Sequence, residues 1–217
     1  MKKVLGTLAI AALAGGASAQ VTSFSFTPTV SGDGTAVSNE IAVDFTGQYT
    51  GSQILLELTQ GTILQEQAFG SDVDVAPGEG LANAAGGLLF DTYVAQGSRF
   101  SDGPGAIGAP NLGGGAVNIR TTDAGAVFND PTTISQAYNP PGGLLILDGT
   151  NFVIAQIALS SDAQGTFKFF ASANDEVPAI DDIEEFVINN GVIEIPEPAS
   201  AALLGLGGLA MLRRRSA

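Results

Sequence analysis

The chain has 217 residues, a formal net charge of −14, and no cysteine, histidine or tryptophan. The missing cysteine and histidine exclude a thiol nucleophile, a serine–histidine–aspartate relay, a redox dithiol and a zinc site built on sulfur or imidazole ligands. Between residues 20 and 195, 21 acidic side chains stand against three basic ones, and this charge of −18 excludes nucleic acid as a partner because it repels the phosphate backbone.

The N-terminal residues predict an export signal. Two lysines precede a short apolar run, residues 4–14, which a pair of glycines ends. This run is too short to span a bilayer. The small-residue cleavage pattern of signal peptidase follows, carried by Ala17, Ala19 and Gln20, with Gln20 as the first residue of the mature chain. We therefore expect residues 1–19 to be a signal peptide.

Short runs that alternate apolar and polar residues predict β-strands through the expected extracytoplasmic domain, residues 20–195. The first run, residues 23–30, ends at a turn formed by residues 31–34. Further candidate strands are residues 41–45, 53–59, 88–95, 115–119, 144–148, 151–160, 165–172, 186–188 and 192–195. Between the last two, Asn190-Gly191 favours a type I′ hairpin turn. About eight to ten short strands predict an all-β domain, an antiparallel β-sandwich or jelly roll.

Helical patterns are sparse in the same region. Residues 60–69, 131–137 and 179–186 each have room for a turn or two of helix. The glycine- and proline-rich stretch 101–115 is either a long loop or a linker between two domains. A single domain is favoured, because each half of a divided chain would be small for a substantial core.

The end of this region resembles a known type of module. Strands 151–160 and 165–172, followed by the closing stretch NNGVIEI, are similar to the last strands of cohesin-type β-sandwiches. The resemblance implies a cohesin-like or carbohydrate-binding-module-like sandwich. It assigns no partner-binding residue.

An acidic stretch near the end of the domain is a candidate calcium site. Its oxygen ligands are of the kind that calcium takes, but they lack the EF-hand spacing, so a solvated loop is the favoured interpretation. The residues are Asp175, Glu176, Asp181, Asp182, Glu184 and Glu185. Asp72 and Asp74 place two carboxylates on one face of a strand, and solvent exposure is again the favoured interpretation.

Sugar binding has candidate residues in the sequence, whereas glycoside hydrolysis has none. Tyr49, Tyr93, Tyr138 and Arg99 would suit a sugar-binding face, although buried or edge tyrosine is the commoner role. Glycoside hydrolysis needs two carboxylates about 5–9 Å apart, and the sequence singles out no such pair. We therefore expect no enzymatic activity.

The C-terminal residues 196–217 consist of three parts in a fixed order. Pro196, Glu197 and Pro198 come first, and the prolines predict an extended, accessible stretch because they lack a backbone donor. The 14 small or apolar residues 199–212 follow, and as a helix they would reach about 21 Å, short of the roughly 30 Å hydrocarbon layer. Three arginines, which should stay on the cytoplasmic side, come last: Arg213, Arg214 and Arg215. A permanent single-span anchor is the alternative.

This arrangement resembles the PEP-CTERM sorting signal. The resemblance implies transient insertion in the inner membrane of a Gram-negative bacterium through a short transmembrane-type helix. It also implies processing by an exosortase and delivery to the cell surface or an extracellular polysaccharide matrix. The expected partners are signal peptidase, the exosortase and exopolysaccharide.

Together these features predict an exported structural or adhesion protein of the cell surface or matrix. We expect no cofactor, with a structural calcium ion as the alternative. Two other functions stay open: a carbohydrate-binding or cohesin-like module acting on exopolysaccharide, and a secreted glycoside hydrolase.

Overall fold

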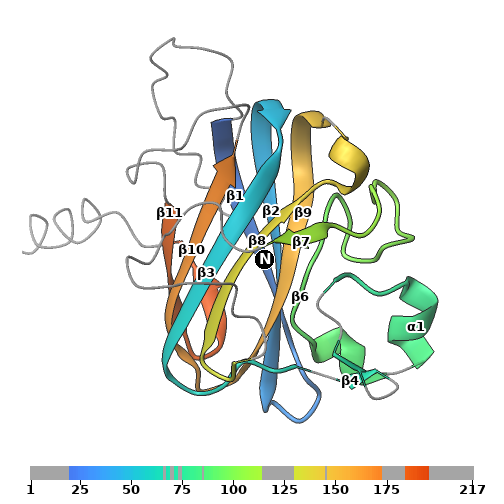
Figure 1. The fold of residues 1–217 in the computed structure, drawn as a ribbon. Helices are drawn as coiled ribbons and strands as arrows, with labels where there is room; N and C mark the ends of the chain where they lie inside the picture. The colour runs from blue at the N-terminus through green and yellow to red at the C-terminus, as the bar shows by residue number, and fades with distance from the viewer. Residues whose placement is uncertain are drawn as a thin grey trace, which may run out of the picture.

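A computed structural model describes residues 20–65, 67–68, 71–72, 75–84, 86–113, 130–144, 146–172 and 184–195. These residues form two antiparallel sheets packed as a sandwich (Figure 1). The first sheet has four strands in the order β1-β2-β9-β6, and the second has six in the order β12-β11-β10-β3-β8-β7. The predicted antiparallel β-sandwich is therefore confirmed.

The strands and helices have the following bounds. The first sheet contains β1 (Gln20–Val30), β2 (Ala36–Tyr49), β6 (Tyr93–Val94) and β9 (Ile146–Ser160). The second contains β3 (Gly51–Gln60), β7 (Asn111–Gly113), β8 (Thr133–Asn139), β10 (Gln164–Ser172), β11 (Glu184–Asn189) and β12 (Val192–Glu194). A separate pair is formed by β4 (Gln67–Ala68) and β5 (Ser71–Asp72), and the short helices are α1 (Glu79–Ala84), η1 (Gly86–Phe90) and η2 (Pro141–Gly143).

The main core lies between the two sheets and follows the predicted alternation. Ile41, Val43 and Phe45 point inward from β2 and are almost completely buried. An aromatic group closes the side of the sandwich at β1, where Phe24 and Phe26 meet the ring of Phe186 at centroid distances of 4.7 and 4.8 Å. These contacts join the first strand of one sheet to the second sheet.

A second layer covers the outer face of the first sheet. Its short helices α1 and η1 lie beside the sandwich in Figure 1, and β6 is the adjoining edge strand of the first sheet. A small apolar cluster joins Tyr93, Ala76 and Ala95 to Ala42 of β2 and Val153 of β9. Since β2 and β9 are covered on both faces, β9 is buried without interruption from residue 152 to residue 159.

The helices expected from sequence are wrong where the structure describes those residues. Residues 133–137 belong to β8, because Ile134 and Tyr138 alternate inward and the strand pairs with β3. The described part of 179–186 begins β11. The described residues of 60–69 include the end of β3, an isolated bridge at Ile63 and the two-residue strand β4. Conversely, α1 has no predicted counterpart.

Two strand predictions are also corrected by the structure. Residues 88–95 form part of the 3₁₀ helix η1 and then only a two-residue strand, and Leu88 is buried against Ala82 of α1. Residues 144–148 and 151–160 are not separate, since one strand, β9, runs through both. Asp148 and Asn151 within it have positive φ angles and accompany register shifts against β2. The candidate strand 115–119 lies outside the described residues.

The loop 101–115 does not divide the chain into two domains over its described part. The amide of Ser101 donates to the carbonyl of Pro77, and that of Ile107 donates to Gln96, so the loop folds back on the outer layer. Strands on either side of it in sequence pair with one another, β3 with β8 and β2 with β9. The linker alternative is therefore wrong.

Candidate functional site at the last strand

The predicted sorting triplet begins two residues after the last strand of the sandwich. β12 pairs with β11 through three residue pairs, Val187 with Glu194, Ile188 with Ile193 and Asn189 with Val192. Asn190 and Gly191 have φ angles of 51° and 76°, and the two positive values confirm the predicted type I′ turn. Ile193 is 1% exposed, whereas Ile195 is 58% exposed. The chain thus passes from core to solvent within two residues.

A buried asparagine fixes this hairpin to the opposite sheet. The Asn39 side chain on β2 donates from Nδ2 to the carbonyls of Gly191 at 2.8 Å and Ile157 at 3.2 Å. Its Oδ1 accepts the amide of Ile193 at 3.1 Å. Asn39 is fully buried. We call these three hydrogen bonds the Asn39 bridge, and they hold β12 where its own sheet provides only one strand partner.

The edge of β11 extends beyond β12. Because β12 covers only Val187 to Asn189, the described chain places no strand beside Glu184–Phe186 on that side. Glu184 and Glu185 are exposed there, and Glu185 forms an ion pair of 3.0 Å with Lys168 of β10. The end of the sandwich next to the predicted triplet is therefore acidic, and the described strands leave Glu184–Phe186 unpaired on this side of β11.

The predicted signal-peptidase site adjoins the other edge strand on this side. Gln20 is the first residue of β1 and pairs with Thr46, and β1 contacts β12 across the two sheets. Ala17 and Ala19 lie outside the described residues, as do the sorting residues Pro196, Glu197 and Pro198 and the arginines Arg213, Arg214 and Arg215. The structure thus describes the two edge strands next to the predicted signals: β1, which follows the signal peptide, and β12, which precedes the sorting signal.

The proposed sugar-binding face is wrong. Tyr49 and Tyr93 are fully buried and Tyr138 is 2% exposed, so none of the three rings can stack on a sugar. Their hydroxyls are used internally: Tyr138 donates to the carbonyl of Ile154 at 2.9 Å, and Tyr49 Oη lies 2.6 Å from Ser52 Oγ. Burial raises the pKa of both groups above their ordinary range.

Tyr93 and Arg99 belong to a polar contact region under the outer layer. Tyr93 donates to Gln156 Oε1 at 3.1 Å, and Gln156 Nε2 donates to the carbonyl of Asp91 at 2.8 Å. Arg99 Nη2 donates to the carbonyl of Leu89 at 3.1 Å and its guanidinium lies over the Phe100 ring. Burial raises the Tyr93 pKa to about 12. These contacts attach the layer to β9, which is a structural role.

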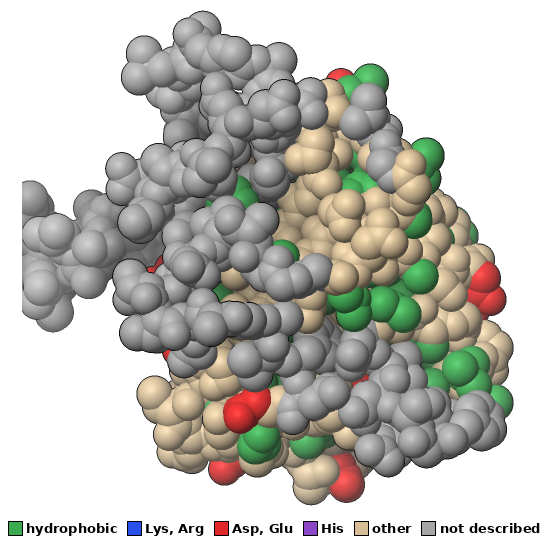
Figure 2. All heavy atoms as spheres, viewed as in Figure 1, with side chains coloured by type: hydrophobic (Ala, Val, Ile, Leu, Met, Phe, Trp, Pro, Cys, Tyr) green, Lys and Arg blue, Asp and Glu red, His purple; other side chains and the backbone are tan. Residues whose placement is uncertain are grey.

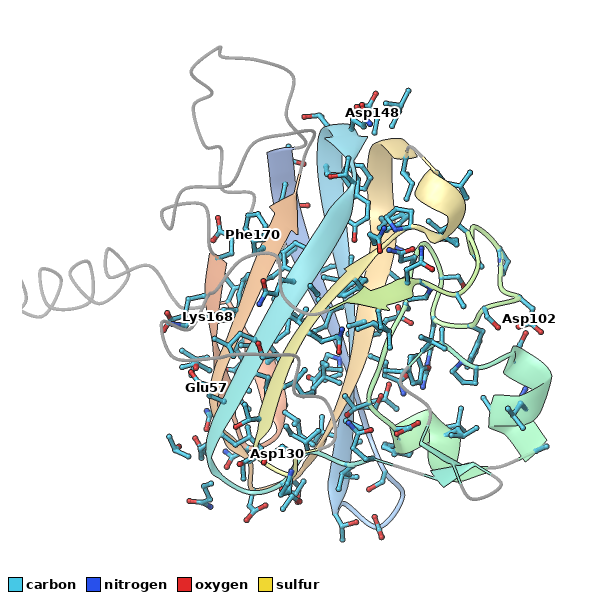
Figure 3. All side chains as sticks on the ribbon, in the orientation of Figure 1. Glu57, Asp102, Asp130, Asp148, Lys168 and Phe170 are labelled. Atoms are coloured by element: carbon cyan, nitrogen blue, oxygen red, sulfur yellow. The ribbon has the colours of Figure 1, made fainter. Side chains whose placement is uncertain are left out.

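The acidic candidates are only partly described. Asp175, Glu176, Asp181, Asp182 and Asp74 lie outside the described residues, and so does the side chain of Asp72. Within the described residues, no group of three or more acidic side chains is arranged to hold a metal ion. The labelled carboxylates of Glu57, Asp102, Asp130 and Asp148 come from separate parts of the molecule in Figure 3.

Comparison with known proteins identifies the C-terminal segment. Residues 194–216 match the family described as a PEP-CTERM protein-sorting motif, which confirms the resemblance inferred from the triplet, the apolar run and the arginines. The motif implies export, processing by an exosortase and association with the cell surface. No curated protein and no solved structure matches the chain. No helix in the described part of the chain is long and apolar enough to cross a membrane.

Proposed function

We propose that the protein is a non-enzymatic structural or adhesive component of the cell surface or extracellular matrix, with the sandwich as its working part. The observation that carries the proposal is the sorting motif, whose match begins at Glu194 inside the last strand. The sorting motif therefore directs the export and processing of the sandwich to which it is joined. The export signal at residues 1–19 would bring the chain across the inner membrane, and residues 199–212 would hold it there until the exosortase acts.

The chemistry of the described side chains supports a role without catalysis. Tyr93 and Tyr138 donate hydrogen bonds internally, and Tyr49 shares one with Ser52. Asp33 and Asp130 accept bonds from their own turns, and Asp102 accepts the Glu79 amide at the start of α1. These groups are therefore occupied in holding the fold. A secreted glycoside hydrolase would instead need two carboxylates facing one cleft.

Electrostatics supports release after processing. Residues 20–195 carry a charge of −18, and Glu184, Glu185 and Glu194 are exposed at the end from which the tail continues. Anionic headgroups repel such a surface within a Debye length of about 8 Å at physiological salt. Once the tail is cut, nothing in this charge distribution holds the domain at the inner membrane, so it can move to the surface or matrix.

The test is the mass of the mature protein in cells that carry the exosortase and in cells from which its gene is deleted. We expect the tail to be absent in the first and retained in the second. Replacing Pro196, Glu197 and Pro198 by alanine should retain the tail in both, while Glu194→Ala, an exposed change just upstream, should behave as the unchanged chain. A surface-located protein that still ends at Ala217 in exosortase-positive cells would contradict the proposal.

The functional class has a separate test. Matrix material from the producing cells, with and without calcium, should be compared for retention of the processed protein, and the protein should be screened against glycoside substrates. We expect assembly into the matrix without turnover. Turnover that is lost on a single carboxylate-to-amide change would instead identify a hydrolase, and calcium-dependent retention on purified polysaccharide would identify a carbohydrate-binding or cohesin-like module.

A further inference from the structure

We infer that the edge of the sandwich sets the upstream boundary of the processing site. β12, held by the Asn39 bridge, is inaccessible as far as Glu194, and the sequence of the Pro-Glu-Pro triplet disfavours further pairing along β11. The inference rests on the proposed function in treating the triplet as the place of processing. It adds a fold-dependent limit that the sorting motif by itself does not contain.

The first step is that β12 is inaccessible while it is paired. A processing enzyme binds its substrate as an extended strand whose backbone groups are free. In β12 these groups pair with β11, the Ile193 side chain is buried in the core, and the Ile193 amide is bound by Asn39. Ile195 is therefore the first residue that such an enzyme can hold without opening the sandwich.

The second step concerns what stops β12 from becoming longer. If its register with β11 continued, Ile195 would face Phe186, Pro196 would face Glu185 and Glu197 would face Glu184. Proline cannot donate to the ladder, and like charges directly opposite one another are destabilising. The sequence of the triplet therefore disfavours continued pairing with β11 for two separate reasons.

The third step is that the boundary depends on a completed fold. Asn39 lies on β2 of the first sheet, and the residues that it binds, Gly191 and Ile193, lie 152 and 154 positions later in the chain. The bridge can form only when both sheets have assembled. In a chain whose sandwich is incomplete, β12 would be an exposed strand, and the region open to proteases would extend upstream of Ile195.

The test is limited proteolysis of the full chain in mild detergent with a protease of broad specificity. The mass of the fragment that retains β11 and β12 locates its C-terminal end. For the unchanged chain we expect an end at Ile195 or within the triplet that stays there on prolonged digestion. Asn39→Ala should move the end upstream of Val192 and speed hydrogen exchange of the Ile193 amide about tenfold.

Matched controls separate the bridge from a general loss of stability. Asn189→Ala makes the same change at an exposed site of the same hairpin and should leave the end and the exchange rate unchanged. Should Asn39→Ala not fold, Ile193→Ala removes a buried side chain of β12 but keeps Asn39 and the backbone amide that it binds, and should also move the C-terminal end of the fragment upstream. Its control is Ile195→Ala, an exposed change two residues along.

The triplet is tested in the opposite direction. Pro196→Val, Glu197→Lys and Pro198→Val in one chain restore the donors and reverse the charge, so β12 should lengthen. The protected end should then move downstream, and exchange of the Glu184–Phe186 amides should slow. This exchange readout is independent of whether an exosortase still recognises the altered triplet.

Two results would overturn the inference. One is digestion of the unchanged chain that proceeds into β12. The other is a protected fragment whose C-terminal residue is the same in the unchanged chain, Asn39→Ala and Ile193→Ala. No exosortase takes part in the digestion. Retention of the tail in exosortase-positive cells, together with a boundary at Ile195 in the digestion, would therefore contradict the proposed function but would still show that the sandwich limits cleavage at Ile195.

Discussion

Asp33 shows how the acidic residues of this protein are used at the scale of a single side chain. Its Oδ1 accepts the Ser31 hydroxyl at 2.6 Å and the amide and hydroxyl of Thr35 at 3.1 and 2.9 Å. These hydrogen bonds lower its pKa from 3.8 to about 2. The carboxylate closes the predicted turn between β1 and β2, which is a local role and needs no ligand.

This depressed pKa predicts a pH dependence of stability. Asp33 stabilises the folded chain fully above its unfolded pKa of 3.8, and this contribution is lost as the pH falls toward about 2. Asp33→Asn should therefore lower the melting temperature at neutral pH, and the difference from the unchanged chain should shrink between pH 4 and pH 2. Thermal melts of both chains across this range measure it. A difference in melting temperature that stays constant down to pH 2 would contradict the prediction.

Gly191 is required for two separable reasons. Its φ is +76°, and a Cβ there would lie 2.7 Å from the Ser160 carbonyl and 3.0 Å from a Val37 methyl group. Gly34 has a similar φ of +73° but open space around it. Gly34→Ala should thus lower the free energy of unfolding by about 1 to 2 kcal/mol through the left-handed conformation alone. Gly191→Ala should lower it by clearly more, as urea unfolding will measure.

Equal losses for the two alanine variants would show that the chain around Ser160 yields to the added methyl group without penalty. The fit of the type I′ turn against β2 and β9 would then be looser than its geometry indicates.

At the scale of elements, β1 is attached to the second sheet chiefly by its aromatic side chains. Phe26 meets Phe186 at 4.8 Å and Phe167 at 6.4 Å. Phe26→Ala should lower the free energy of unfolding by about 3 kcal/mol because it leaves a gap between the sheets. Val30→Ala, on the same strand but 60% exposed, should change it little. Similar losses in the two variants, measured by urea unfolding, would contradict this role for the aromatic group.

The strands were predictable where one face meets the core and the other meets solvent or a polar layer. Alternation in β1 and β10 is visible in the sequence because a strand repeats every two residues. The sequence predicts residues 88–95 as one strand because most of this stretch is apolar, but Leu88 of η1 is buried against α1, and only Tyr93 and Val94 of β6 are buried as part of the first sheet. Burial on both sides removes the alternation that distinguishes a strand from other buried segments.

The candidate site was predictable only in its linear part. The triplet, apolar run and arginines form a local order that one sequence displays, and the turn Asn190-Gly191 is equally local. Asn39 gave no signal, because its partners follow it by more than 100 residues and only the assembled sheets bring them together. The sugar-binding face predicted from the tyrosines was wrong because residue type alone does not tell a buried ring from an exposed one.

At the scale of the whole molecule, the acidic domain and the apolar C-terminal tail should have opposite effects on membrane binding. Acidic side chains lie around the face seen in Figure 2, where no described lysine or arginine is visible. The full chain should therefore partition into vesicles rich in phosphatidylglycerol through its tail, whereas the chain truncated after Ile195 should stay in solution at low salt. Co-sedimentation measures both. Binding of the truncated chain would contradict the proposed release by charge repulsion.

The single residue between β12 and the triplet also governs orientation. One extended residue spans only about 3.5 Å, so Ile195 is too short a linker to let the sandwich rotate freely relative to the triplet. Whatever grips the triplet must meet the molecule at its β1–β12 flank, with the outer layer carrying α1 on the far side of the first sheet. Every copy bound through its triplet would therefore have the same orientation, with the β1–β12 flank toward the enzyme and the opposite flank toward the surroundings.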